Sequence, residues 1–177
     1  EIGLLEEREK SIIMDLNKAY SDYYKKEELV NKSLLKIEDL LVKNIEKTGN
    51  EQQDLKLVEN LNKIKDLKDL IFNNREELNS PTTNLSKEDK KRLNSEITTF
   101  RKEVATLMKT MPNDIKKAFD NYDYNVAMLE KSLINLEKSE LNSINHNDII
   151  NAKIEKIKRL NNSPDQDDYT RSGIIPP

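Results

Sequence analysis

The 177-residue sequence contains no cysteine and no tryptophan, and only one histidine, three glycines and five prolines. Without cysteine the chain has no disulfide, no thiolate zinc site and no cysteine nucleophile, and its redox compartment stays undecided. The scarcity of glycine and proline removes the turns that β-hairpins and β-sandwiches require. A single histidine means that no site can use two imidazoles. These absences favour an all-helical chain without metal chemistry.

Motifs for catalysis and cofactor binding are equally scarce. A di-iron helical bundle needs a glutamate three residues before each histidine ligand, but Ser143 stands there before His146. We therefore expect His146 to be a solvated helix residue. The glycines are isolated, so no phosphate-binding loop is present. The acidic run at 165–168 lacks the glycine and the closing glutamate of a calcium loop. The sequence thus predicts no enzyme, no cofactor and no metal site.

Charge is abundant and balanced. Charged residues make up 36% of the chain and apolar residues 35%, and 30 basic and 33 acidic side chains are interspersed. A net charge of −3 disfavours a dedicated nucleic-acid binder. No stretch approaches the roughly 18 apolar residues of a membrane span, and the start lacks a signal-peptide core. Because the chain begins with Glu1, we expect a segment of a longer protein. Its location is left undecided, with an intracellular one (cytoplasm or nucleus) favoured.

Apolar residues recur in steps of three and four along the last third of the chain. We call such a run a seam, because it marks one face of a helix that packs against a partner. It reads Ile115, Phe119, Tyr122, Val126, Leu129, Leu133 and Leu136. The same phase continues through the polar residues Glu140, Ser143 and Asn147 to Ile150, Ile154 and Ile157. Since the phase survives the polar gap, one continuous helix is favoured over a break at 142–148.

Similar seams and capping residues predict four helices, over about 4–48, 51–79, 87–111 and 113–161. Gly49 suits the left-handed residue that ends a helix. Asn50 and Ser86 suit the N-cap positions of the second and third helices. Residues 162–177 read as an extended or disordered tail.

These lengths predict an elongated antiparallel helical bundle or coiled coil, with two long helices of about 45 residues and two shorter ones. Each long helix would span about 70 Å. If neighbours run antiparallel through short loops, all four helices overlap at one end. The start of the first helix and the end of the fourth then extend together as a two-stranded stalk, with both chain ends at its far tip.

Candidate partner contacts are the aromatic residues beside the seams and the apolar end of the tail. Tyr20, Tyr24 and Tyr124 flank seam positions, where an exposed tyrosine can anchor a partner. Ile174 and Ile175 lie in the tail. Two basic clusters, at 87–92 and 153–159, are interleaved with acids, and we expect both to be solvated faces.

The expected function is non-enzymatic: a structural or protein–protein interaction module, as a coiled-coil subunit or scaffold segment of a larger multiprotein assembly. A protein partner would bind by helix-in-groove or coiled-coil pairing, and self-association is one form of this. Nucleic acid is not favoured as a partner. The alternatives are a membrane-surface tether and a secreted or surface-displayed helical adhesin of a bacterium or parasite.

Overall fold

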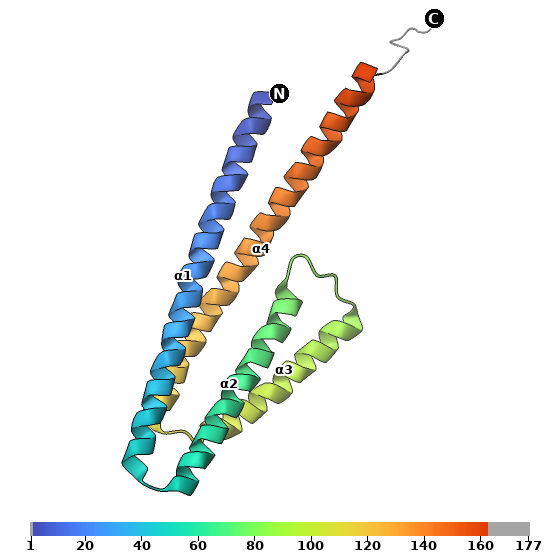
Figure 1. Cartoon of the computed structure of the whole chain (residues 1–177). Coiled ribbons are helices and arrows are strands. Elements are labelled where there is room, and N and C mark those ends of the chain that lie inside the picture. The colour runs from blue at the N-terminus through green and yellow to red at the C-terminus, as the bar shows by residue number, and fades with distance from the viewer. Residues whose placement is uncertain (1, 163–177) are drawn as a thin grey trace, which may run out of the picture.

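A computed structural model describes residues 2–162, and this part of the chain folds into four α-helices joined by short turns (Figure 1). The helices are α1 (Ile2–Thr48), α2 (Glu51–Asn79), α3 (Lys87–Met108) and α4 (Asn113–Asn162). No strand occurs within these residues. The all-α class, with two long and two shorter helices, is confirmed. Most of the predicted tail, including Ile174 and Ile175, lies outside the described residues.

The helix ends follow from local capping chemistry. Gly49 ends α1 with a positive φ of 58°, a conformation that costs glycine little. The Asn50 side chain accepts a hydrogen bond from the backbone N–H of Gln53 at 3.2 Å. The Ser86 hydroxyl oxygen accepts one from the N–H of Asp89 at 3.0 Å. Each N-cap is worth about 1 kcal/mol, and all three predicted capping residues are confirmed.

The third helix ends earlier than its apolar period predicts. α3 stops at Met108, whereas the sequence places its end at 111. The N–H of Thr110 bonds the carbonyl of Leu107 at 3.0 Å, and that of Met111 bonds Met108 at 3.1 Å. Hydrogen bonds between residues three apart are typical of a 3₁₀ turn, which is wound more tightly than an α-helix. The turn still directs Met111 into the core, where it is buried, so the apolar period outlasts the helix.

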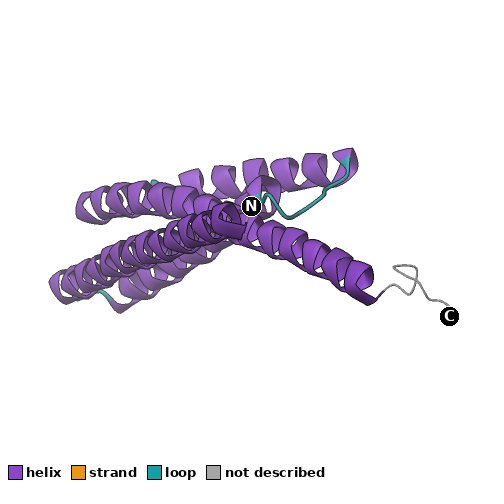
Figure 2. Ribbon diagram, turned by 90° about the horizontal axis from the view of Figure 1, so that it is seen from above, coloured by secondary structure: helices purple, strands orange, loops and turns teal. Residues whose placement is uncertain are grey.

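The four helices form two antiparallel pairs, α1 with α4 and α2 with α3, that join at one end of the molecule (Figures 1 and 2). α1 and α4 pack along each other over the longest interface, and α2 packs along α3. α2 runs parallel to α4 and touches α1 and α4 over shorter lengths. We call residues 23–137, which hold all of α2 and α3, the head. The remaining lengths of α1 and α4 form the stalk.

Polar side chains fix the register between α1 and α4. The Ser132 hydroxyl donates to Asp22 Oδ2 at 2.6 Å. Asn125 Nδ2 donates to Ser33 Oγ at 2.5 Å, further into the head. Hydrogen bonds between specific side chains select one register, because a shifted helix would leave these groups unpaired.

The core lies in the head, where all four helices meet. Its buried members are Ile37, Leu61, Ile64, Met111, Ile115, Ala118, Phe119 and Tyr122. Phe119 is fully buried and meets the Tyr122 ring edge-on, with centroids 6.2 Å apart. The Lys68 ammonium lies 5.5 Å from the centre of the Phe119 ring. The first half of the α4 seam is therefore core, as its apolar residues predict.

Beyond the head, α1 and α4 diverge toward their ends instead of staying paired (Figures 1 and 2). α4 itself is uninterrupted through 142–148, as the phase of its seam predicts. Ser143 and Asn147 occupy seam positions on α4, and Glu9 takes the equivalent place between Leu5 and Ile12 on α1. Polar residues at these positions gain little from burial, so the pair is not held closed there. We call residues 3–15 of α1 and 147–162 of α4 the tip.

Candidate functional site

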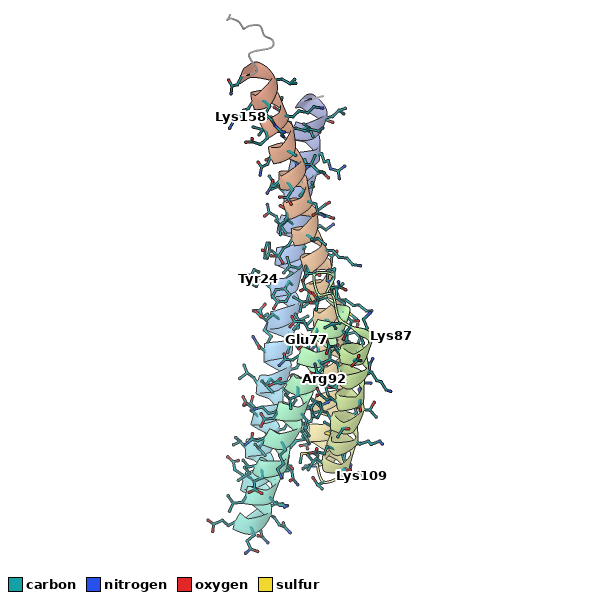
Figure 3. All side chains as sticks on the ribbon, turned by 90° about the vertical axis from the view of Figure 1, so that its right-hand side faces the viewer. Tyr24, Glu77, Lys87, Arg92, Lys109 and Lys158 are labelled. Carbon is teal, nitrogen blue, oxygen red and sulfur yellow. The ribbon has the colours of Figure 1, made fainter. Side chains whose placement is uncertain are left out.

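Tyr20 and Tyr24, two of the predicted contact residues, lie together on α1. The Tyr20 hydroxyl donates to Glu140 Oε2 at 2.8 Å across the α1–α4 interface. This hydrogen bond to the carboxylate raises the pKa of the Tyr20 phenol, and desolvation adds to the shift. The Tyr24 ring stacks on that of Tyr20, with centroids 6.3 Å apart. Tyr20 thus serves the stalk internally, while Tyr24 is exposed where the stalk leaves the head (Figure 3).

Tyr124 is exposed on α4, apart from the other two tyrosines. The adjacent Asn125 donates to the carbonyl of Leu29 at 3.4 Å, which sets this part of α4 beside a turn of α1 beyond Tyr24. The structure therefore brings together two of the three tyrosines. Their contact with a partner stays a prediction.

His146 is buried, with 4% of its surface exposed, contrary to the expectation of a solvated residue. It is the last buried residue of α4, and beyond it only Ile150 is shielded in part. The α1–α4 register sets it opposite the part of α1 around Ile12. Within residues 2–162 its Nε2 has no hydrogen-bond partner. Its burial depends on the neighbouring helix, which its own helical position does not reveal.

A cleft of about 540 Å³ lies in the head, between the α2–α3 hairpin and the α1–α4 pair. This volume is in the range of small-molecule sites. Every helix contributes an apolar residue to its wall: Val30, Phe72, Val104 and Val126. The charged residues of the lining are three cations and three carboxylates: Lys68, Arg75, Arg101, Asp69, Asp123 and Glu130. Because these charges balance, the cleft favours neither an anionic nor a cationic ligand.

Polar contacts recur along one side of the cleft, where α2 meets α4. Lys68 Nζ lies 2.7 Å from Asp123 Oδ1, and Arg75 Nε lies 2.6 Å from Glu130 Oε2. The Ser80 hydroxyl donates to Glu137 Oε2 at 3.1 Å. We call these three contacts the ladder. The ladder was not predicted from the sequence, although bases on α2 and acids on α4 recur at the same seven-residue spacing.

The titratable groups of the cleft do not form a catalytic set. Burial raises the pKa of Tyr122 to about 12, and the nearby carboxylates of Asp69 and Asp123 add to the shift. Burial also raises the pKa of Asp69, with a further contribution from Asp66. A phenol that stays protonated beyond neutral pH is not a base, and no nucleophile paired with a base lines this cleft.

Within residues 2–162, no three histidine or carboxylate side chains converge on a position that could hold a metal ion. No helix there is long and apolar enough to cross a membrane.

The tip exposes apolar residues on both of its helices. On α4, the seam residues Ile154 and Ile157 are 43% and 56% exposed. The tip also exposes Leu4, Ile13, Met14, Ile149 and Leu160, and Ile144 is exposed just before the α4 tip begins. A contiguous apolar patch on a protein surface often marks an interaction site, whereas apolar residues exposed singly are common and need no explanation.

The tip is also strongly charged. The predicted basic cluster on α4 is solvent-exposed, as expected, with Lys153, Lys156, Lys158 and Arg159. Lys158 projects at the opposite end of the molecule from Lys109, which follows the end of α3 (Figure 3). The tip of α1 is exposed over Glu6, Glu7 and Glu9. Apolar residues bordered by charges make the tip the strongest candidate for a functional surface.

No protein-family model, curated protein or solved structure matches this chain. The features that bear on function are therefore its own: an exposed apolar tip, a charge-balanced cleft and a buried histidine.

Proposed function

We propose that this chain is a non-enzymatic protein–protein interaction module, a scaffold segment or subunit of a larger multiprotein assembly, which binds through its tip. The observation that carries the proposal is the exposure of seam residues Ile154 and Ile157 at the end of a 50-residue helix. Exposing such residues has a free-energy cost of about 25 cal/mol for each Å² of apolar surface. A partner helix that covers them by coiled-coil pairing or by helix-in-groove docking removes that cost.

The division of the molecule supports the same function. The head contains the apolar core and the ladder, so the contacts that stabilise the fold lie mainly outside the tip. The stalk then extends the tip beyond the head, with Tyr20 bonded to Glu140 near its base. A stable body that presents an unpaired helical surface is suited to connect other proteins.

Photo-crosslinking at the tip tests the proposal. A photoreactive residue placed at Ile157 should crosslink a protein in the cells that make the chain. The same residue placed at Lys102, which is exposed on α3 in the head, serves as the matched control. Crosslinking at Ile157 no greater than at Lys102 would contradict an interaction role for the tip.

A membrane-surface tether is the second candidate. The end of α4 supports it, because its exposed isoleucines stand beside four basic residues, as in helices that lie on anionic lipid. The acidic tip of α1 weighs against it, because Glu6, Glu7 and Glu9 would be repelled by the same lipid. Binding of the chain to vesicles of phosphatidylserine and phosphatidylcholine would favour the tether.

A further inference from the structure

The tip carries more apolar surface than its own two helices can cover. On α4, Ile150 is half-buried, whereas Ile149, about 100° further around the helix, is exposed. On α1, Ile12 is half-buried and its neighbour Ile13 is exposed. If α1 and α4 closed on each other, each would still show a second apolar side. A stripe this wide is typical of a helix with more than one neighbour.

The two helices of the tip differ in charge. Residues 3–15 of α1 hold four acids and two bases, while residues 147–162 of α4 hold four bases and two acids. The helix dipole favours an acid in the first turn of a helix and a base in the last turn. The first turn of α1 holds no acid, and Arg159 is the one base in the last turn of α4, so the dipoles account for only one of these charges. No ion pair joins these two segments to each other. The tip therefore presents an acidic surface and a basic surface, both open.

These features define the chemistry of the occupant. It must bring apolar helical surface, with basic groups for the α1 tip and acidic groups for the α4 tip. An anionic membrane or a nucleic acid attracts one helix and repels the other. A second copy of this chain supplies both surfaces at once.

We propose that the tip is a self-association surface, at which the α4 tip of each of two copies packs on the α1 tip of the other. This inference rests on the proposed interaction function and names the partner as a second copy. The two copies use the same patch, so the contact closes as a dimer and does not extend into a filament. The four tip helices then enclose Ile149, Ile154 and Ile157 in a small bundle.

Light scattering on the purified chain over a range of concentrations should find a dimer. The double substitution Ile154→Asp and Ile157→Asp should raise the dimer dissociation constant by roughly tenfold or more. Helical content and melting of the monomer should not change, because both side chains are exposed. The matched control is Leu35→Asp with Val42→Asp, at residues 60% and 54% exposed on α1 in the head, which should leave the dimer intact.

Charge reversal distinguishes pairing between copies from closure within one chain. A chain with Glu6→Lys, Glu7→Lys and Glu9→Lys should be monomeric, as should one with Lys153→Glu, Lys156→Glu and Arg159→Glu. An equimolar mixture of the two variants should form a heterodimer, since opposite charges then face each other again. Reversal of Lys90, Lys91 and Lys102, which are exposed on α3, changes three charges in the head and should not weaken the dimer.

A chain that stays monomeric at all concentrations, or a dimer that survives the Ile154→Asp/Ile157→Asp change, would overturn the inference. The inference would also be overturned if the natural chain binds phosphatidylserine vesicles and the charge reversal of Lys153, Lys156 and Arg159 abolishes that binding. If the chain is monomeric but Ile157 still crosslinks a different protein, self-association fails and the proposed function stands. If the chain is monomeric and Ile157 crosslinks no protein, both the self-association and the proposed function fail.

Discussion

His146 marks the residue at which burial along the stalk ends. Its imidazole is removed from water, yet Nε2 has no hydrogen-bond partner within residues 2–162. A buried polar group left unpaired costs about 1–3 kcal/mol. The histidine therefore weakens the interface beyond which α1 and α4 separate.

Substituting His146→Leu should raise the free energy of unfolding by about 1 kcal/mol, because leucine fills a similar volume without a polar atom to satisfy. Urea denaturation at neutral pH, followed by circular dichroism, measures the change. Asn145→Leu is the control, since Asn145 is exposed and its replacement should alter the free energy by less than about 0.5 kcal/mol. A less stable His146→Leu variant would show that the imidazole has a partner that stabilises it.

At the scale of secondary-structure elements, the ladder holds α2 against α4. These two helices share a short interface, so the few contacts between them weigh heavily in the position of the α2–α3 hairpin. In the Arg75–Glu130 pair, the Glu130 side chain is only 16% exposed, which limits screening by water and salt. The α3 surface offers a comparison in Arg92 and Glu96, which are 3.3 Å apart and more exposed.

A double-mutant cycle with Arg75→Ala and Glu130→Ala should give a coupling free energy of about 1 kcal/mol, because the pair is partly shielded and links two helices. The same cycle at Arg92 and Glu96 should give about 0.3 kcal/mol, typical of an exposed pair within one helix. Both are measured by urea unfolding at the same ionic strength. Equal coupling in the two cycles would mean that the ladder does not fasten the hairpin.

Features of the elements that depend on local chemistry could be predicted from the sequence. Gly49, Asn50 and Ser86 mark helix ends because capping involves residues within one turn. The continuity of α4 could be predicted because a seam keeps its phase only along one helix. The end of α3 could not, since Met111 stays in phase through a tighter turn that has the same apolar pattern.

Features that depend on the distance between helices could not be predicted from the sequence. The burial of His146 and the exposure of Ile154 both follow from how far apart α1 and α4 lie, and each seam alone is the same whether its partner is near or far. Lys68 and Asp123 could have been paired by their seven-residue spacing, but only once α2 and α4 were known to run side by side. For the candidate surface at the tip, the sequence identified the basic residues of α4. It did not reveal that α1 and α4 diverge there and leave the surface exposed.

At the scale of the whole molecule, apolar burial is concentrated in the head. Every member of the main core cluster lies between Ile37 and Tyr122, and none lies in the tip. The stalk has polar bonds near its base, while most of the tip is exposed. Local stability follows burial, so the free energy of local opening should fall along α4 from the head to the tip.

Hydrogen exchange measures this gradient directly. At a concentration where light scattering finds monomer, the backbone amides of 149–162 should exchange at least roughly a hundredfold faster than those of 115–136, because opening the tip breaks few buried contacts. The two stretches belong to one helix, so a difference between them cannot come from helix length or from separate folding units. As the concentration rises into the range of the proposed dimer, protection should increase in 149–162 and stay constant in 115–136. Equal protection along α4 in the monomer would mean that the tip is closed in solution, and its apolar residues would then not be available to a second copy.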